Sequence, residues 1–346
     1  MQNKQEAKGV YIFHPVKGKC RLNCIFCLKN DSSREEIKNA IKDEINALKE
    51  YSKKFVLKKI HLSGNDLLDF VNVPKLIEII KKELQSSEIT FSFETHGIGL
   101  TKEYLIKLVE SGVRSFGFPL YAPKAELHDK IVGYNGAFNY IKGLLKTIKE
   151  NENHFKSKGV NFRINSLILK QNQEYLPHLI YYLKDFTSEI ISIMLALPSH
   201  DEVTLKYHPH FQDCYPDLSN LKDKLIDTIK LSKKYHLELI LFNIPFCLFY
   251  DGTLKNIGYF RSNIAEIYSL KEANNLRQNR ELNAFKLVLV NECKKCTFFS
   301  QCSGIYQVYV KNELFKPKPI TLSNILTHLK IATFLNNPLF LANKKR

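Results

Sequence analysis

Through the first two hundred residues, short β-branched or aromatic runs alternate with longer stretches in which apolar residues recur every three or four positions. Runs of the first kind predict strands, and stretches of the second kind predict amphipathic helices. Six strands are expected, at 10–13, 55–62, 89–94, 115–120, 161–169 and 190–197. Helices are expected from Ser33 onward and over 74–84, 102–111, 137–149 and 174–183.

The regular alternation of strand and helix predicts a parallel α/β sheet. Six strand–helix units build a (β/α)6 partial TIM-like barrel, in which ligands gather at the carboxyl ends of the strands. Residues 1–200 are expected to form this barrel. Residues 201–346 are expected to form a C-terminal extension with a helix at 218–235, a strand at 237–244 and a second group of cysteines.

Three cysteines follow the first predicted strand in the spacing C-x3-C-x2-C: Cys20, Cys24 and Cys27. Three thiolates on one loop can hold three irons of a [4Fe–4S] cluster and leave the fourth iron open to a ligand. A zinc knuckle completed by His14 is the alternative, because closely spaced cysteine pairs are common in zinc sites.

With the aromatic Phe26 before its last cysteine, this motif resembles the signature of the radical S-adenosylmethionine (SAM) superfamily. The resemblance implies that the amino and carboxylate groups of SAM chelate the open iron. It also implies that an injected electron cleaves SAM to a 5′-deoxyadenosyl radical, and that Phe26 contacts the adenine.

The turn after the second strand, Ser63, Gly64, Asn65 and Asp66, resembles the glycine-rich turn of the superfamily. That turn implies contacts with the methionyl amino group of SAM. The match departs from the family pattern, since Ser63 replaces a glycine and Asn65 and Asp66 stand where Glu and Pro are usual. Considered alone, Ser-Gly-Asn-Asp is a good turn sequence.

Two further strands carry polar residues of interest. Glu94 and Thr95, where the third strand ends, resemble the strand end that lines the ribose of SAM in the superfamily. Arg163 and Asn165 alternate to the same face of the fifth strand. The resemblance implies a contact with the SAM carboxylate, and an internal salt bridge is the alternative. Residues 128–138 resemble a segment found in many peptide-modifying members.

The second cysteine group, Cys293, Cys296 and Cys302, has the spacing C-x2-C-x5-C. It resembles part of the SPASM or twitch extension, which holds auxiliary iron–sulfur clusters in many radical SAM maturases. The resemblance implies one auxiliary [4Fe–4S] cluster. Its fourth ligand could come from Cys247, and Cys214 is the less favoured candidate. If neither cysteine reaches the cluster, one iron would be open to the substrate. A structural zinc ribbon is the alternative.

The net charge of +16 and the eight cysteines also constrain the function. The positive charge comes mainly from lysines scattered over predicted helix faces, which is weak evidence for a nucleic-acid partner. Cysteines in a chain without a secretion signal point to metal binding before disulfides. No apolar stretch is long enough to span a bilayer, so we expect a cytoplasmic protein with no membrane partner.

We therefore expect a radical SAM enzyme that modifies a ribosomally made peptide or protein, with flavodoxin or ferredoxin as electron donor. One alternative is a radical SAM enzyme acting on RNA or on a nucleotide-derived small molecule. Another is a zinc-bearing nucleic-acid-binding protein. The sequence singles out no residue that takes part in hydrogen abstraction.

Overall fold

We describe the protein from a computed structural model. The structure describes residues 5–6, 11–14, 20–27, 34–186, 188–198, 209–250, 258–260, 287–300, 302 and 304–321. Its centre is one parallel sheet with the strand order β10-β9-β8-β7-β6-β5-β4-β2. These strands span Tyr11–Phe13 (β2), Lys59–Leu62 (β4), Thr90–Glu94 (β5), Val113–Pro119 (β6), Asn161–Leu167 (β7), Ile191–Ala196 (β8), Glu238–Phe242 (β9) and Gly258–Phe260 (β10).

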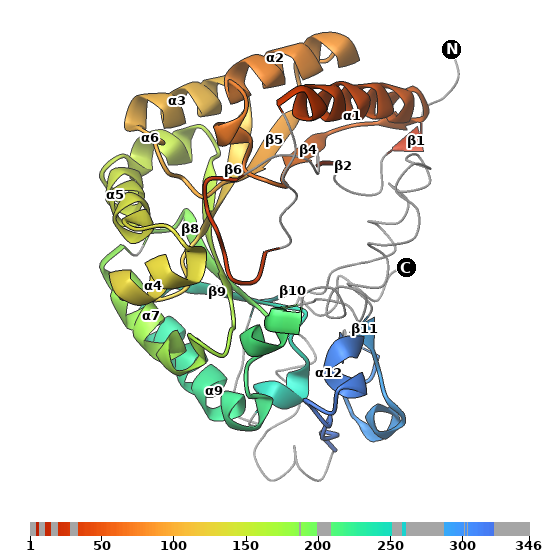
Figure 1. Ribbon diagram of the computed structural model, residues 1–346, viewed down its shortest axis with the longest axis vertical. Coiled ribbons are helices and arrows are strands. Elements are labelled where there is room, and N and C mark those ends of the chain that lie inside the picture. Colours follow the sequence, from red (N-terminus) through yellow and green to blue (C-terminus); the bar gives the residue numbers. More distant parts are fainter. Residues whose placement is uncertain are drawn as a thin grey trace.

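Helices cover the outer face of this curved sheet (Figure 1), which confirms the predicted α/β partial barrel. They span Arg34–Lys54 (α1), Val73–Leu84 (α2), Lys102–Ser111 (α3), Ala125–Val132 (α4), Ala137–Glu150 (α5), Glu152–Ser157 (α6), Leu176–Leu183 (α7) and Leu218–Lys234 (α9). No helix among the described residues is long and apolar enough to cross a membrane.

The predicted strands and helices lie close to the observed ones, with three differences. Helices α4 and α6 were not predicted, and the sheet continues beyond the six predicted strands into β9 and β10. The second predicted strand, 55–62, is two strands, because β3 (Phe55–Val56) pairs with β1 (Gln5–Glu6) in a separate two-stranded sheet. Only β4 enters the barrel. The start of the first helix at Ser33 lies outside the described residues.

The two faces of the barrel strands differ in polarity, and this difference positions the site. Residues that point outward pack under the helices, as Phe116, Phe118 and Phe162 do in a stack with ring centroids 5.3–6.3 Å apart. Along β7, buried residues alternate with partly exposed ones. Arg163 and Asn165 belong to the partly exposed set, which faces the inside of the barrel.

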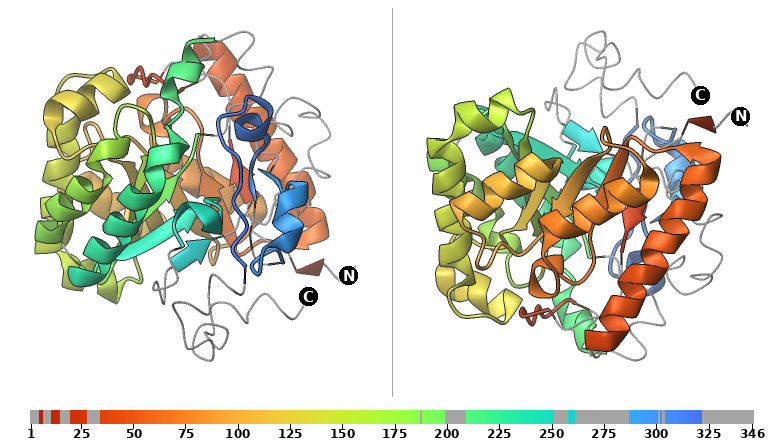
Figure 2. Two further views of the ribbon diagram at one scale, coloured as in Figure 1. Left: turned by 90° about the horizontal axis from the view of Figure 1, so that it is seen from below. Right: turned by 90° about the horizontal axis from the view of Figure 1, so that it is seen from above.

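The sheet continues past residue 200, since β9 and β10 add to its edge in parallel. Beyond them, β11 (Leu287–Val288) and β12 (Ile305–Tyr306) form a short antiparallel pair, with a 3-10 helix η6 (Asn291–Lys295) between them and α12 (Gln307–Lys311) after them. Figure 2 shows this C-terminal segment in blue, beside the elements that follow β9. Asn243 Nδ2 donates to the Tyr306 hydroxyl over 3.1 Å, and the Phe246 and Phe298 rings stack at 4.8 Å.

Candidate active site

The first three cysteines lie together on residues 20–27, here called the cysteine loop, which follows β2. Each of them is partly buried. The loop turns where the Cys27 N–H donates to the Cys24 carbonyl over 3.1 Å. Burial raises the pKa of the Cys20 thiol to about 11. Such a thiol keeps its proton at neutral pH unless a metal cation replaces it, which fits a metal ligand.

An aromatic pair stands beside these thiols. The Phe26 and Tyr121 rings meet edge to face at 5.1 Å. Burial raises the pKa of the Tyr121 hydroxyl well above its ordinary value, and the nearby thiolates of Cys24 and Cys27 add to the shift. The predicted adenine contact, Phe26, therefore packs in an aromatic surface that borders two of the three cysteines.

The end of α4 supports the cysteine loop from one side. The Asn23 N–H donates to the Val132 carbonyl over 2.8 Å, and the Ile25 N–H donates to the Ile131 carbonyl over 3.0 Å. Gly133 adopts φ +62°, and a Cβ on it would lie 2.5 Å from the Asn23 carbonyl oxygen. Part of the 128–138 segment identified in the sequence thus packs against the cysteine loop and hydrogen-bonds to its backbone.

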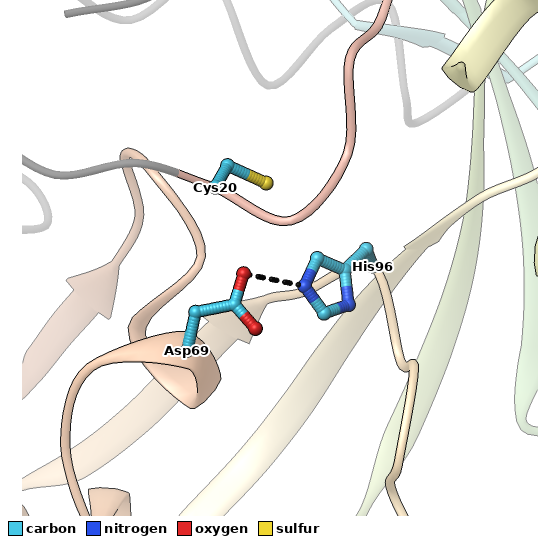
Figure 3. A group of neighbouring side chains, drawn as sticks. All are labelled: Cys20, Asp69 and His96. Carbon is cyan, nitrogen blue, oxygen red and sulfur yellow. Dashed lines mark hydrogen bonds and ion pairs between the residues drawn. The ribbon is translucent and has the colours of Figure 1, made fainter. Parts of the chain in front are cut away.

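Asp69, from the 3-10 helix η1 (Leu67–Asp69) after β4, supports the same loop from the other side. Its carboxylate accepts the Arg21 backbone N–H over 2.8 Å and the Arg21 Nε–H over 2.6 Å. His96 Nε2 lies 3.1 Å from Asp69 Oδ2. The Cys20 sulfur faces both side chains (Figure 3). One ligand atom from each of the three residues lies within 4.8 Å of the other two.

Asp66, predicted as a SAM contact, is buried and holds the turn together. It accepts hydrogen bonds from the Thr95 hydroxyl over 2.7 Å, from the Leu68 N–H over 3.0 Å and from the His96 N–H. Burial raises the pKa of the Asp66 carboxyl, and these partners oppose the rise. Asp66 and Thr95 therefore join the end of β4 to the end of β5, which brings the two predicted strand ends together.

The remaining residues of that turn pack against His14. The His14 Nδ1 and Ser63 Oγ atoms lie 3.2 Å apart. Gly64 adopts φ +112°, and a Cβ on it would come within 3.3 Å of the His14 ring. Asn65 follows, partly exposed. Among the described residues, His14 is not in the set of ligand atoms that gathers around Cys20.

A polar cluster inside the barrel contains the other predicted residues. Arg163 Nη2 and Asn165 Nδ2 each donate to one oxygen of Glu94, and Arg163 Nε donates to Asn165 Oδ1 over 2.7 Å. Burial raises the pKa of the Glu94 carboxyl against the pull of Arg163. Gly117 makes room for this carboxylate, since a Cβ there would lie 1.8 Å from Glu94 Oε2. The internal ion pair left open by the sequence is present.

Two residues of this interior were missed in the sequence, Lys59 and His61 on β4. Burial lowers the pKa of both, and the charge of Arg163 adds to the shift. For His61 the pKa falls to about 4, so its ring is neutral at neutral pH, with Nδ1 2.8 Å from Ser92 Oγ. The alternation of Lys and His in the strand before the Ser-Gly-Asn-Asp turn was the available signal.

The structure also brings together Cys247, Cys293, Cys296 and Cys302, here called the four-cysteine group. All four line one cavity between η6, β12 and residues 317–319. Backbone N–H groups point at two of the four sulfurs: the Gly304 N–H donates to Cys302 Sγ over 3.4 Å, and the Ile320 N–H donates to Cys296 Sγ over 3.5 Å. Such donors stabilise thiolates in metal sites.

Burial raises the pKa of Cys247 to about 12, and the other three thiolates of the four-cysteine group raise it further. Cys214 lies elsewhere, with its thiol donating to the Ile25 carbonyl of the cysteine loop over 3.6 Å. Of the two candidates for a fourth ligand, the structure therefore places Cys247 at the second cysteine group.

The spacing of the sulfurs bears on the choice between zinc and a cluster. One zinc ion about 2.3 Å from each sulfur holds the sulfurs about 3.8 Å apart. Among the described residues, no three cysteine sulfurs lie within 4.8 Å of one another. As they stand, the described sulfurs of neither set include three as close together as one zinc ion would hold them.

Comparisons with known proteins agree with this geometry. Residues 15–180 match the model of the Radical SAM superfamily. A protein of Methanocaldococcus jannaschii named "Probable GTP 3′,8-cyclase" is 26% identical over 278 residues, which cover 75% of this chain and 89% of that protein. The "GTP 3′,8-cyclase" of Nautilia profundicola is 21% identical over 326 residues, covering 92% and 90% of the two chains.

Solved structures share the fold. Streptococcus suis SuiB bound to S-adenosylmethionine has a TM-score of 0.53 at 15% identity, covering 93% of this chain and 77% of that one. The structure of anSMEcpe with bound AdoMet also has a TM-score of 0.53, at 14% identity, covering 97% and 98% of the two chains. The family match supports the radical SAM class, and the solved structures show the same fold.

Proposed function

We propose that this chain, whose family match and fold support radical SAM chemistry, is an enzyme that acts on a purine nucleoside triphosphate. The observation that carries the proposal is the cationic interior of the barrel, where burial lowers the pKa of Lys59 and the nearby charge of Arg163 lowers it further. The activity in the names of the sequence relatives, GTP 3′,8-cyclisation, agrees with an anionic substrate.

In this proposal Cys20, Cys24 and Cys27 hold a [4Fe–4S] cluster with one open iron. When bound, the cluster and SAM supply a 5′-deoxyadenosyl radical that abstracts a hydrogen atom from the substrate. Phe26 would lie against the adenine, beside Tyr121. The turn of Ser63, Gly64, Asn65 and Asp66 would face the methionyl group.

Glu94 and Thr95 would lie near the SAM ribose, and Arg163 and Asn165 near its carboxylate. Arg163 has five N–H donors. The described contacts use two of them, one on Glu94 and one on Asn165. The other donors are available for a carboxylate or a phosphate, which the planar guanidinium binds in a bidentate manner.

Lys59 and Arg163 supply two positive charges, and Glu94 supplies one negative charge. His61 adds no positive charge at neutral pH, because its pKa is about 4. These three groups together therefore carry a net positive charge, which attracts a phosphorylated substrate at a partly buried position.

We further propose that the four-cysteine group holds one auxiliary [4Fe–4S] cluster. Four thiolates occupy four irons, so this cluster would have no iron open to substrate. Because no iron would be open, this cluster would transfer electrons or support the fold. Reductive cleavage of SAM consumes one electron, and we propose flavodoxin or ferredoxin as its source.

The test is anaerobic turnover of the reconstituted protein with SAM, a chemical reductant and GTP, with ATP as the matched comparison. Formation of a bond at ribose C3′ removes the hydrogen there, so GTP deuterated at C3′ should deliver deuterium into 5′-deoxyadenosine. Lys59→Ala should raise KM for GTP about tenfold, because the variant loses one charged contact with the substrate. If SAM is cleaved at the same rate with and without GTP, and no deuterium enters 5′-deoxyadenosine, GTP is not the substrate.

Peptide modification is the second candidate, and the closed four-cysteine group favours it, because the sequence of that group resembles maturases. Mass spectrometry of peptides encoded beside the gene, with and without the enzyme, tests it directly. A peptide that loses two hydrogens, together with GTP left unchanged, would select this candidate over the first.

A further inference from the structure

Cys20, Asp69 and His96 form the one set of three potential metal ligands that gathers within 4.8 Å among the described residues. They come from three separate segments, the cysteine loop, η1 and the end of β5 (Figure 3). A thiolate, an imidazole and a carboxylate form a donor set that suits zinc and ferrous ions. The three cysteines of the cysteine loop do not gather this closely.

The geometry of Asp69 and His96 suits a single ion. His96 Nε2 and Asp69 Oδ2 are 3.1 Å apart. Two ligand atoms that each lie about 2.0–2.2 Å from one tetrahedral ion are about 3.3–3.6 Å apart, so these two need to separate by only a few tenths of an ångström. The Cys20 sulfur has to move closer to the other two ligand atoms to complete the set. Rotation of the Cys20 side chain about χ1 is enough for that movement.

A carboxylate lies beside the second nitrogen of the buried His96 ring. The His96 side chain is 3% exposed, and Nδ1 lies 3.2 Å from Asp66 Oδ2. Asp66 is itself fixed by Thr95 and Leu68. A carboxylate that accepts from the second ring nitrogen orients the ring and strengthens it as a ligand.

The proton on His96 has two positions. Without an ion, the Ile98 N–H donates to Nδ1 over 3.0 Å, and Nε2–H points at Asp69. With an ion on Nε2, the proton moves to Nδ1, where Asp66 is the acceptor, at the expense of the Ile98 hydrogen bond. The Cys20 thiol releases its proton to solvent when the ion binds.

We propose that the cluster-free chain binds one divalent transition-metal ion, Zn²⁺ or Fe²⁺, at Cys20, Asp69 and His96. Cys20 also belongs to the triad proposed to hold the cluster, so the ion and the complete cluster exclude each other. Occupancy by Zn²⁺ holds the protein inactive until the ion is removed. Occupancy by Fe²⁺ places the first iron where cluster assembly begins.

The experiment counts ions and needs no substrate, so its outcome is independent of the proposed function. The full-length chain is purified anaerobically, freed of metal with a chelator and titrated with Co²⁺, whose thiolate bands report binding. The unmodified chain should bind two ions, one at this site and one at the four-cysteine group. Competition of Zn²⁺ and of Fe²⁺ with bound Co²⁺ then ranks the affinities of these two ions for the sites.

Four variants decide the assignment. The double variant Cys24→Ser/Cys27→Ser should still bind two ions, because it removes the other cysteines of the loop and leaves the site. His96→Ala should bind one ion, and Asp69→Asn should bind the ion at this site at least about tenfold more weakly. His178→Ala, an exposed histidine on α7, is the matched control and should bind two.

Far-UV circular dichroism establishes that each variant is folded. Two ions on His96→Ala, or one ion on Cys24→Ser/Cys27→Ser, would overturn the proposal, since the ion would then belong to the three cysteines. Preloaded Zn²⁺ should also slow incorporation of iron and sulfide in the unmodified chain and have no such effect in His96→Ala.

Discussion

Asp69 receives both the backbone N–H and the Nε–H of Arg21, so a residue after β4 fixes the position of the residue that follows Cys20. The two contacts act on main chain and side chain at once. The loop that carries the three cysteines is therefore held before any metal arrives, which lowers the entropy lost when a cluster binds.

Removing this contact should loosen the cysteine loop. Arg21→Ala keeps the main-chain contact and should cost about 1 kcal/mol or less, because the Arg21 side chain is 42% exposed and solvent screens the pair. Asp69→Ala removes both contacts and should cost more. A double-mutant cycle in urea measures the coupling, and additive losses would show that the side-chain pair contributes nothing.

Gly133 should not tolerate a side chain. In Gly133→Ala the new Cβ meets the Asn23 carbonyl oxygen at 2.5 Å in a left-handed backbone conformation, φ +62°. We expect a loss of about 2–4 kcal/mol in unfolding free energy, which sums the backbone strain and the clash. Faster release of iron to a chelator should accompany the loss.

Gly159→Ala is the matched control for this substitution. Gly159 has a similar φ of +64°, and a Cβ there meets nothing within 4 Å. Its cost should be the backbone term alone, about 1 kcal/mol. Equal losses in the two alanine variants would mean that contact with Asn23 does not matter.

Gly117 should be essential for the polar cluster inside the barrel. A Cβ at this position would lie 1.8 Å from Glu94 Oε2, so Gly117→Ala has to displace the carboxylate that Arg163 and Asn165 hold. We expect weaker SAM binding by isothermal titration calorimetry and a lower melting temperature. Gly143→Ala, in the middle of α5 with nothing within 4 Å, should instead stabilise the protein by about 0.5–1 kcal/mol.

His61 should make stability depend on pH in the acid range. Burial lowers its pKa from the ordinary 6.5 to about 4. Between these values the unfolded chain binds a proton that the folded chain does not, so stability falls as the pH drops from about 6.5 to about 4 and changes no further below that. His61→Gln should flatten this part of a urea-unfolding series, and an unchanged slope would contradict the assignment.

The two cysteine sets should fail in different ways. Cys24→Ala should abolish cleavage of SAM to 5′-deoxyadenosine, because it removes a proposed ligand of the SAM-binding cluster. Cys296→Ala should leave uncoupled cleavage while product formation is lost. Liquid chromatography of 5′-deoxyadenosine and of product separates the outcomes, and equal loss of cleavage in both variants would argue against a separate role for the four-cysteine group.

The sequence by itself determined the parallel barrel, because the periodicity of apolar residues within each segment predicts whether it is a strand or a helix. It also located both cysteine groups, because metal ligands on one loop have a recognisable spacing in the sequence. The positions of Cys20, Cys24 and Cys27 after the first strand, and of Glu94 and Arg163 on the third and fifth predicted strands, follow from that pattern.

Only the tertiary structure decided which distant residues meet. It placed Cys247 rather than Cys214 beside Cys293, paired Arg163 with Glu94, and set Asp69 and His96 against Cys20. These contacts join residues that are 27 to 76 positions apart in the chain and follow from strand order and register, which local sequence patterns do not encode.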